Sequence, residues 1–345
     1  MERRGTSEPQ SCNGAAGARS RTHRMKLAAG LLLLGATAIA GASEETTIVI
    51  TPTGNETPIG QAPGSVTVVS AQEIASRSHG NVAEALETVP GINVVRSGPR
   101  GQITSLFARG ANSNHTLVMR DGMVLNDPSS PTGAYDFSSM SLNGVERIEI
   151  VRGPLSTLYG SSAIGAVINI ISKPGTLAPH HAIRLGAGSH GRFESAVSTS
   201  GSSGRLRYQL SLSHSRSEGE TAVMQHPAYG NTGQIPEDDG ARNTEFNTRL
   251  TWHMSDESRL ELGAFMKRAR TDIDEFLTED SDWTLGNREK SLQLQLYHRP
   301  VDGDWGLQLG LRHNETDRRS ENPRQVPTQN RIDTRYLGKH QSVET

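Results

Sequence analysis

The sequence predicts an α+β domain followed by part of a large antiparallel transmembrane β-barrel. Residues 64–176 combine strand-like and helix-like patterns with Gly-rich turns, whereas the residues from about 180 onward form alternating strands. In this second part, short turns alternate with long polar connections. That sorting of connections by length is typical of outer-membrane barrels. The strands of soluble β-sandwiches also alternate between apolar and polar residues, but short turns and long loops rarely alternate along the chain in these proteins.

Residues 1–42 have the features of a secretory signal peptide. The apolar run at 27–40 is too short to span a bilayer, follows three basic residues and ends in an A-x-A pattern, so cleavage is expected after Ala42. Met25 is a candidate true start, which would make the residues before it an over-extended start. The single cysteine, Cys12, lies in this segment, so we expect no disulfide or thiol chemistry in the mature chain.

Composition and motif searches exclude several function classes. A mean hydropathy of −0.51 argues against a helical membrane protein, and a net charge of −2 argues against a nucleic-acid partner. We find no Cys pair, no H-E-x-x-H, no P-loop lysine and no G-x-S-x-G, so no enzyme is predicted. The pair His180-His181 falls at the junction of the two parts and is interpreted as a polar linker rather than a metal site.

Residues 43–63 carry several Pro and Gly residues and little apolar mass, which predicts a flexible segment. A short β-prone strip lies inside it. Two interpretations are open: a disordered mature N-terminus, or a peptide that adds a strand to the edge of another protein's sheet. The strip consists of Glu45, Thr46, Thr47, Ile48, Val49, Ile50 and Thr51.

The α+β domain begins with a strand at 65–70 and a helix that opens at Ala71. A second helix is expected over 82–88, because apolar residues recur there at i, i+3, i+4 and i+7. Pro90 and Gly91 end that helix. Further strands are expected at 92–95, 103–109 and 117–120, the last followed by a turn at Asp121-Gly122.

The domain ends in two strand-like runs, 145–152 and 166–171, joined by a Gly-rich connector. The first run partly alternates, with Ile148 and Ile150 on one face and Arg147 and Glu149 on the other. The second run is nearly all β-branched, which is expected of a strand packed on both faces. From the residues alone, a small α+β domain with Gly-rich turns would also account for this stretch.

Four ordered blocks resemble the plug domain of TonB-dependent outer-membrane receptors. They are LETVPGI at 86–92, FARG at 107–110, MRDGM at 119–123 and the stretch 144–171. One departure is Ala166, where members of the family usually carry glycine. The resemblance implies that 64–176 is the plug domain. It also implies that the strip at 45–51 is the Ton box, which TonB pairs with and pulls on, using the inner-membrane proton gradient.

Residues 177–345 are then expected to be the N-terminal portion of the receptor barrel. We count about seven alternating strands and the start of an eighth, whereas the barrels of the family have about 22 strands. A plug does not fit inside eight strands, and an open sheet edge is not tolerated in lipid. We therefore expect the chain to be an N-terminal fragment of a longer receptor, with outer-membrane lipid around its barrel.

Five charged residues of the domain need partners if the domain fills a barrel, because charges inside an assembly must be paired. A solvated strand face is the alternative for a free-standing domain. If the barrel is present, we expect these residues to face polar groups on its wall. They are Arg109, Glu146, Arg147, Glu149 and Arg152.

The connection at 218–243 contains YGNTG followed by the acidic run Glu237-Asp238-Asp239 and Gly240. Clustered carboxylates on a flexible backbone suit calcium, although an ordinary acidic loop has the same composition. The passage resembles the calcium-binding loop of the cobalamin receptors of the family. The resemblance implies Asp238 and Asp239 as calcium ligands. Further candidates, from the next long connection, are Asp272, Asp274 and Asp282.

The function implied by the resemblance is active uptake of a large scarce nutrient through the outer membrane, most similar to cobalamin uptake. A ferric siderophore receptor is the first alternative, and a non-transporting envelope binding protein or adhesin is the second. Polar, turn-rich residues of the plug are expected to line the floor of the ligand site. They are Asn112, Ser113, Asn114, His115, Leu125 and Asn126.

Overall fold

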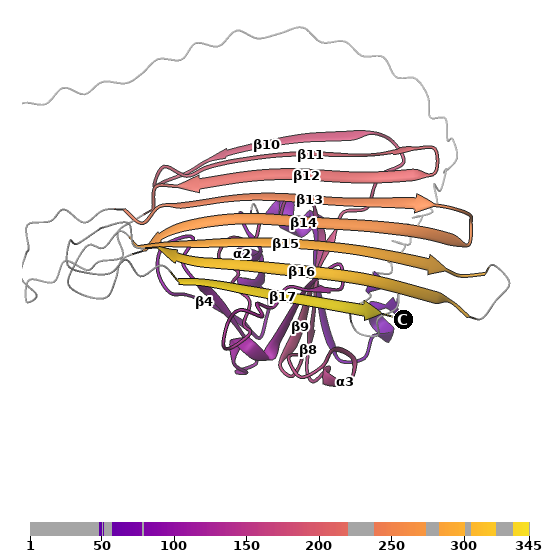
Figure 1. The fold of residues 1–345 in the computed structure, drawn as a ribbon, viewed down its shortest axis with the longest axis horizontal. Coiled ribbons are helices and arrows are strands. Elements are labelled where there is room, and N and C mark those ends of the chain that lie inside the picture. The colour runs from indigo at the N-terminus through magenta and orange to yellow at the C-terminus, as the bar shows by residue number, and fades with distance from the viewer. Residues whose placement is uncertain are drawn as a thin grey trace, which may run out of the picture. The chain divides into compact units, whose positions relative to one another are not determined.

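The computed structural model describes residues 48–49, 51, 57–77, 79–219, 238–273, 283–300, 305–321 and 334–344 (Figure 1). The predicted signal peptide and four residues of the strip, Glu45, Thr46, Thr47 and Ile50, lie outside these ranges. Within the described ranges, no helix is long and apolar enough to cross a membrane.

The α+β domain is built on a five-stranded sheet with the order β3-β8-β9-β6-β7, and a separate hairpin pairs β4 with β5. Strands β6 and β9 are parallel, and the other neighbours are antiparallel. Its elements are β3 (Ser65–Ser70), α1 (Ala71–Ser76), α2 (Val82–Glu87), β4 (Ile92–Arg96), β5 (Thr104–Ala108), β6 (Thr116–Arg120), β7 (Met123–Val124), β8 (Val145–Arg152), α3 (Ser156–Tyr159) and β9 (Ala166–Ser172).

Short polar side chains start the two predicted helices. The Ser70 hydroxyl accepts a hydrogen bond from the Glu73 amide at α1, and the Asn81 side chain accepts from the Glu84 amide at α2, at 2.9 Å. Such caps satisfy amides that have no partner within a helix. Helix α2 ends before Pro90, as the sequence predicts.

Strands β8 and β9 contribute many of the residues of the domain's hydrophobic core. Every residue of β9 is buried, and its Ile168 and Ile170 pack with Ile148 and Ile150 of β8. At the end of β6, Asp121 and Gly122 both have positive φ, of 49° and 80°. Two such residues in succession form the tight hairpin turn that joins β6 to β7. This turn matches the sequence prediction.

The second part is a long sheet of eight strands in chain order, each antiparallel to the next (Figure 1). The strand order runs from β10 to β17, and no pairing joins these two within the described residues. The strands are β10 (His180–Ala187), β11 (Phe193–Ser203), β12 (Leu206–Ser217), β13 (Ala241–His253), β14 (Ser258–Ile273), β15 (Trp283–His298), β16 (Leu307–Glu321) and β17 (Thr334–Glu344).

The two faces of the long sheet differ in chemistry. On one face large apolar side chains are exposed, for example Leu212, Trp252 and Met266. On the other face polar side chains are buried, for example Asn247 and Lys267. An apolar outer face that alternates with a polar inner face is the pattern of an outer-membrane barrel wall.

Several strands are longer than the sequence predicts. The alternation indicates 260–265 and 292–297, whereas β14 spans Ser258–Ile273 and β15 spans Trp283–His298. The added residues are mostly polar or charged, so they give no clear hydrophobic period. They are strand nonetheless, because each is paired with its neighbour across the ladder. The parallel pairing of β6 with β9 was also not predicted.

Candidate functional site

Polar groups of the α+β domain contact the inner face of the long sheet. The Ser141 amide donates to Glu245 Oε1 at 2.9 Å, and Asn243 Nδ2 donates to the Ser139 carbonyl at 2.6 Å. Nearer the domain's β4–β5 hairpin, the Thr271 hydroxyl donates to the carbonyl of Gly101 at 2.9 Å. These contacts satisfy buried polar atoms without making the interface apolar.

Glycine allows one of these close approaches. Gly101 has a φ of 97°, and a Cβ built there would lie 2.4 Å from the Cβ of Ala241. A side chain at this position would therefore be strained by its backbone and would also collide with the long sheet.

A buried ion pair on the sheet anchors an aromatic residue of the domain. Lys267 Nζ lies 3.0 Å from Glu289 Oε2 and donates to the Tyr135 hydroxyl, also at 3.0 Å. Neither charged side chain is more than 2% exposed. Burial and the nearby Glu289 carboxylate raise the pKa of Tyr135, so its hydroxyl stays protonated. The pair gives both buried charges a partner.

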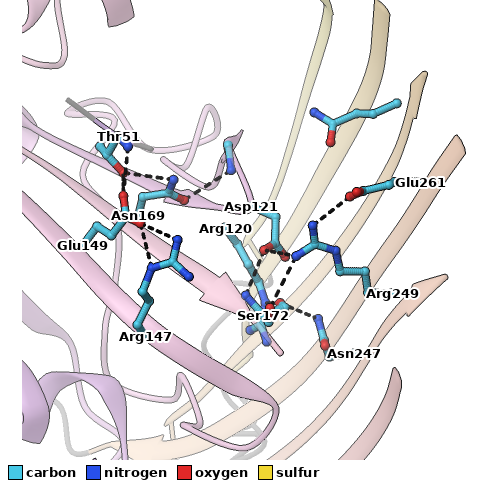
Figure 2. Close-up of polar contacts among 12 residues, drawn as sticks. Thr51, Arg120, Asp121, Arg147, Glu149, Asn169, Ser172, Asn247, Arg249 and Glu261 are labelled. Atoms are coloured by element: carbon cyan, nitrogen blue, oxygen red, sulfur yellow. Dashed lines mark hydrogen bonds and ion pairs between the residues drawn. The ribbon is translucent and has the colours of Figure 1, made fainter. Parts of the chain in front are cut away.

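A second cluster joins the β6–β7 turn to the sheet (Figure 2). Arg249 of β13 donates to Glu261 of β14 at 2.8 Å and to the Ser172 carbonyl at 3.4 Å. Its guanidinium also lies 3.8 Å from the Asp121 carboxylate. Arg120, which is almost fully buried, donates from Nε to the Ser172 hydroxyl at 3.2 Å. Arg249 of the sheet therefore links Glu261 of the sheet to Asp121 and Ser172 of the domain.

The loop after β7 makes a fourth group of contacts. Arg318 of β16 forms an ion pair with Asp127 at 3.2 Å, and Asn314 donates to the Val124 carbonyl at 3.1 Å. These four groups of contacts lie on β13 to β16, so the domain is held along much of the described sheet.

Three residues of the predicted strip are described. Ile48 and Val49 form β1 and pair antiparallel with β2 (Thr57–Pro58). Thr51 is fully buried, and both its amide and its hydroxyl donate to Glu149 Oε2, at 2.8 and 2.6 Å. This end of the strip therefore lies against the domain's own sheet.

Three of the five charged residues expected to face the wall have partners elsewhere in the chain. Glu149 binds Thr51 and Arg147, while Arg152 donates to the Pro90 carbonyl and the Thr67 hydroxyl. Burial and then the charge of Arg109 lower the pKa of Arg152. Within the described residues, these partners belong to the domain and the strip, and a wall role for the three residues stays a prediction.

For Arg109 and Glu146, the described part of the chain shows no hydrogen bond or ion pair to the long sheet. Arg109 adopts a positive φ of 51°, which is uncommon for a residue with a side chain. The wall role of these two residues stays a prediction.

The residues predicted for the ligand floor lie in different environments. Leu125 belongs to the domain core, so it does not face a ligand, contrary to the expectation. The turn-rich sequence around it gave no sign that this one apolar side chain points inward. Asn126 binds three backbone groups, the amide of Val118 and the carbonyls of Thr116 and Gly133. Its role in the structure is to shape the loop.

The other four predicted floor residues lie just before β6. Asn112 is exposed, and Ser113, Asn114 and His115 form the short 3₁₀ helix η2 (Ser113–His115). These residues are accessible at least in part, and their ligand role stays a prediction.

The predicted calcium ligands lie at the start of β13. Asp239 is buried and accepts a hydrogen bond from Gln102 Nε2 at 3.3 Å, whereas Asp238 is exposed. The amide of Asp272 donates to the carbonyl of Gly240, which brings the end of β14 next to this run. Asp274 and Asp282 lie outside the described residues. Among the described residues, no group of three or more His, Cys, Asp or Glu could hold a metal ion.

The wall residues that hold the domain were not predicted from the sequence. Lys267, Arg249 and Glu261 each occupy an inward position of an alternating strand. A signal was present, because Lys267 directly follows the apolar pair Phe265-Met266 in a strand. A charged residue at an inward position of a barrel strand needs a partner, so these positions were candidates for contact.

Residues 58–167 match the family described as TonB-dependent Receptor Plug Domain. The chain belongs to the TonB-dependent receptor family. The vitamin B12 transporter BtuB of Photobacterium profundum is 32% identical over 236 residues, which cover 68% of this chain and 37% of that protein. BtuB of Vibrio vulnificus is 39% identical over 153 residues, 44% of this chain and 25% of that protein.

Solved structures share the fold at lower identity. The ferripyoverdine receptor of Pseudomonas aeruginosa superposes with a TM-score of 0.68 at 18% identity, over 86% of this chain and 41% of that one. The ferric yersiniabactin uptake receptor FyuA of Yersinia pestis gives 0.62 at 22% identity, over 81% and 45%. These similarities confirm the predicted fold class of plug and barrel strands and the outer-membrane location. The chain spans about 37% of the length of the first BtuB relative.

Proposed function

We propose that this protein is a receptor for active, TonB-energised uptake of cobalamin through the outer membrane. The observation that carries the proposal is the identity to two proteins described as vitamin B12 transporters, 32% and 39%. The first of these matches extends over 236 residues, so it reaches beyond the 110 positions of the plug match into the sheet.

The arrangement of the domain supports a transport role. The plug contacts the inner face of the sheet through hydrogen bonds and ion pairs. Polar contacts can be replaced by contacts with water when the plug moves, although each of these bonds to a charged group is worth about 1.5–3 kcal/mol. An interface of this type holds the plug in position and still allows it to be remodelled when TonB pulls.

The strip at 45–51 is the proposed TonB-binding segment. Its β-prone residues suit strand addition, in which the backbone supplies the hydrogen bonds. Pulling on this strip would act directly on the plug, because the described end of the strip is bonded to β8.

Calcium at Asp238 and Asp239 is part of the proposal. Calcium takes six to eight oxygen ligands, more than the described carboxylates of this region provide. Asp239 already accepts a hydrogen bond from Gln102 of the plug. An ion bound here would therefore lie beside Gln102 of the plug, where it would help to shape the ligand site.

A ferric siderophore receptor is the competing function, since the solved structures that share the fold include siderophore receptors. Direct binding separates the two. The receptor in detergent should bind cyanocobalamin with a dissociation constant well below that for a panel of ferric chelates. Binding of a ferric chelate with no binding of cyanocobalamin would replace the proposal by its alternative.

A further inference from the structure

The outer face of the long sheet changes from apolar to cationic partway along its strands. On β14 the inward residues, such as Lys267 and Ala269, are buried, so the residues between them face outward. The outward series runs, in order, through Leu260, Leu262, Ala264, Met266, Arg268 and Arg270. At about 3.3 Å per residue, its apolar part extends about 20 Å along the strand. The two arginines therefore lie just beyond one edge of the apolar band.

Arginines occupy this level on four neighbouring strands, near the ends that the long connections join. We call them the arginine belt: Arg216 of β12, Arg242 of β13, Arg268 and Arg270 of β14, and Arg288 of β15. All five alternate with inward residues and are exposed. In outer-membrane barrels the long loops are extracellular and the short turns are periplasmic. The arginine belt therefore lies at the level of the head groups of the outer leaflet.

The strand register places these arginines directly opposite one another. Arg242 lies opposite Arg216 on one side and opposite Arg270 on the other. Arg268 lies opposite Arg288. Opposite residues of an antiparallel pair have Cβ atoms about 4.5–5.5 Å apart, and like charges at such positions destabilise the sheet. The protein alone therefore carries an electrostatic cost at this level, which an anion bound between the arginines would remove.

Most of these charges have no counter-ion in the described part of the chain. The side chains of Arg242, Arg268 and Arg288 make no hydrogen bond or ion pair there. Asp317 lies opposite Arg288, but its carboxylate is bound by two arginines of β16 and β17. The other two arginines of the belt each pair with one acidic residue, at 3.0 and 3.7 Å. The arginine belt is therefore cationic overall, and its free guanidinium groups point away from the sheet.

We propose that the arginine belt binds the phosphate groups of a phosphorylated glycolipid of the outer leaflet, with Arg242 and Arg268 as its main contacts. These two residues are diagonal neighbours on adjacent strands, which long side chains can bridge. The planar fork of a guanidinium group matches a phosphate with two parallel hydrogen bonds. A lipid also fits the apolar band below, where its acyl chains would lie on Met266 and Phe246. The proposal goes beyond the proposed function and does not depend on which nutrient is taken up.

A double variant, Arg242→Gln with Arg268→Gln, removes two charges that have no partner in the described chain. Glutamine keeps a polar side chain at both positions, so the variant removes no bond within the described sheet. Arg299→Gln is the control, because Arg299 is exposed and follows β15 at the other end of the strand, beside a short turn. It changes the charge in the same direction but lies on the periplasmic side of the apolar band.

Native mass spectrometry of the full-length receptor in neutral detergent measures binding of bisphosphorylated lipid A. The double variant should bind this lipid about tenfold more weakly than the intact receptor, the effect of losing one charge-assisted contact. Arg299→Gln should bind it as the intact receptor does. Added salt should weaken binding to the intact receptor, because exposed charges are screened. Equal affinity in the double variant and the intact receptor, or an equal loss in Arg299→Gln, would overturn the proposal.

Thermal unfolding in the same detergent separates binding from a purely structural role. Without lipid, the double variant should unfold at the same temperature as the intact receptor or higher, because it relieves repulsion. Lipid A should raise the midpoint of the intact receptor, since a ligand stabilises the state that it binds, and should raise that of the double variant less. A lower midpoint of the double variant without lipid would contradict the repulsion. Displacement of lipid A by an equal concentration of inorganic phosphate would overturn the assignment to a lipid.

Discussion

Replacing Lys267 by methionine should destabilise the receptor strongly. Methionine keeps much of the length of the side chain but removes the charge, so Glu289, which is 2% exposed, loses its cation. Tyr135 of the plug loses its hydrogen-bond partner at the same time. The buried carboxylate of Glu245, bonded to the Ser141 amide, lies in the same region. Because both side chains of the pair are buried, bulk water screens the remaining charge only weakly.

The size of the effect follows from this burial. Breaking a buried ion pair by removing one partner costs about 3–5 kcal/mol of unfolding free energy. The pair between Lys339 and Glu315 is the matched control, because its atoms are 3.8 Å apart and the lysine is 56% exposed. Such an exposed pair contributes about 0–1 kcal/mol. Lys267→Met should therefore cost at least about 2 kcal/mol more than Lys339→Met.

Urea unfolding of the receptor in lipid vesicles, followed by tryptophan fluorescence, measures both variants. The double variant Lys267→Met, Glu289→Gln should recover part of the loss, because it removes the uncompensated charge. A cost for Lys267→Met within 1 kcal/mol of the control would mean that water reaches the site or that the ion pair is not formed.

Three further predictions concern the plug and the loops. Burial acts to raise the pKa of Glu84, but the Gly80 amide and the Arg100 guanidinium outweigh it and lower the pKa below its ordinary 4.5. The stability lost in Glu84→Gln should therefore be full above pH 4.5 and vanish as the pH falls through the lowered pKa, as urea midpoints at several pH values will show. Gly175→Ala would place a Cβ 2.6 Å from the backbone nitrogen of Tyr208 and should cost about 1–3 kcal/mol, whereas Gly60→Ala, with nothing within 4 Å, should be close to neutral in the same assay. Calcium chelation should weaken cyanocobalamin binding, and unchanged affinity in a calorimetric titration would remove calcium from the proposal.

The sequence predicts the elements of the plug well because their signals are local. The turn at Asp121-Gly122 and the apolar run of β9 each depend on neighbours in the chain. The limits of the long strands depend instead on pairing across the ladder. Polar residues such as those between 266 and 273 extend β14 only because β13 and β15 lie on either side.

The candidate site is less predictable, since it depends on which distant side chains meet. Arg147 and Glu149 alternate with apolar residues, which suggests a polar face of β8. That pattern gives no information on whether the face meets the wall, water or the strip. The contact of Thr51 with Glu149 joins segments 98 residues apart. Leu125 is a second example. It belongs to the domain core, but the turn-rich sequence around it does not indicate a buried residue.

The most direct test of the proposed function is uptake of radiolabelled cyanocobalamin by cells that carry the receptor with residues 45–51 deleted. These cells should still bind cyanocobalamin at their surface but no longer accumulate it, while cells with the intact receptor should do both. Undiminished accumulation after the deletion, or no surface binding by the intact receptor, would contradict it. An adhesin or other non-transporting binding protein would show no difference between the two.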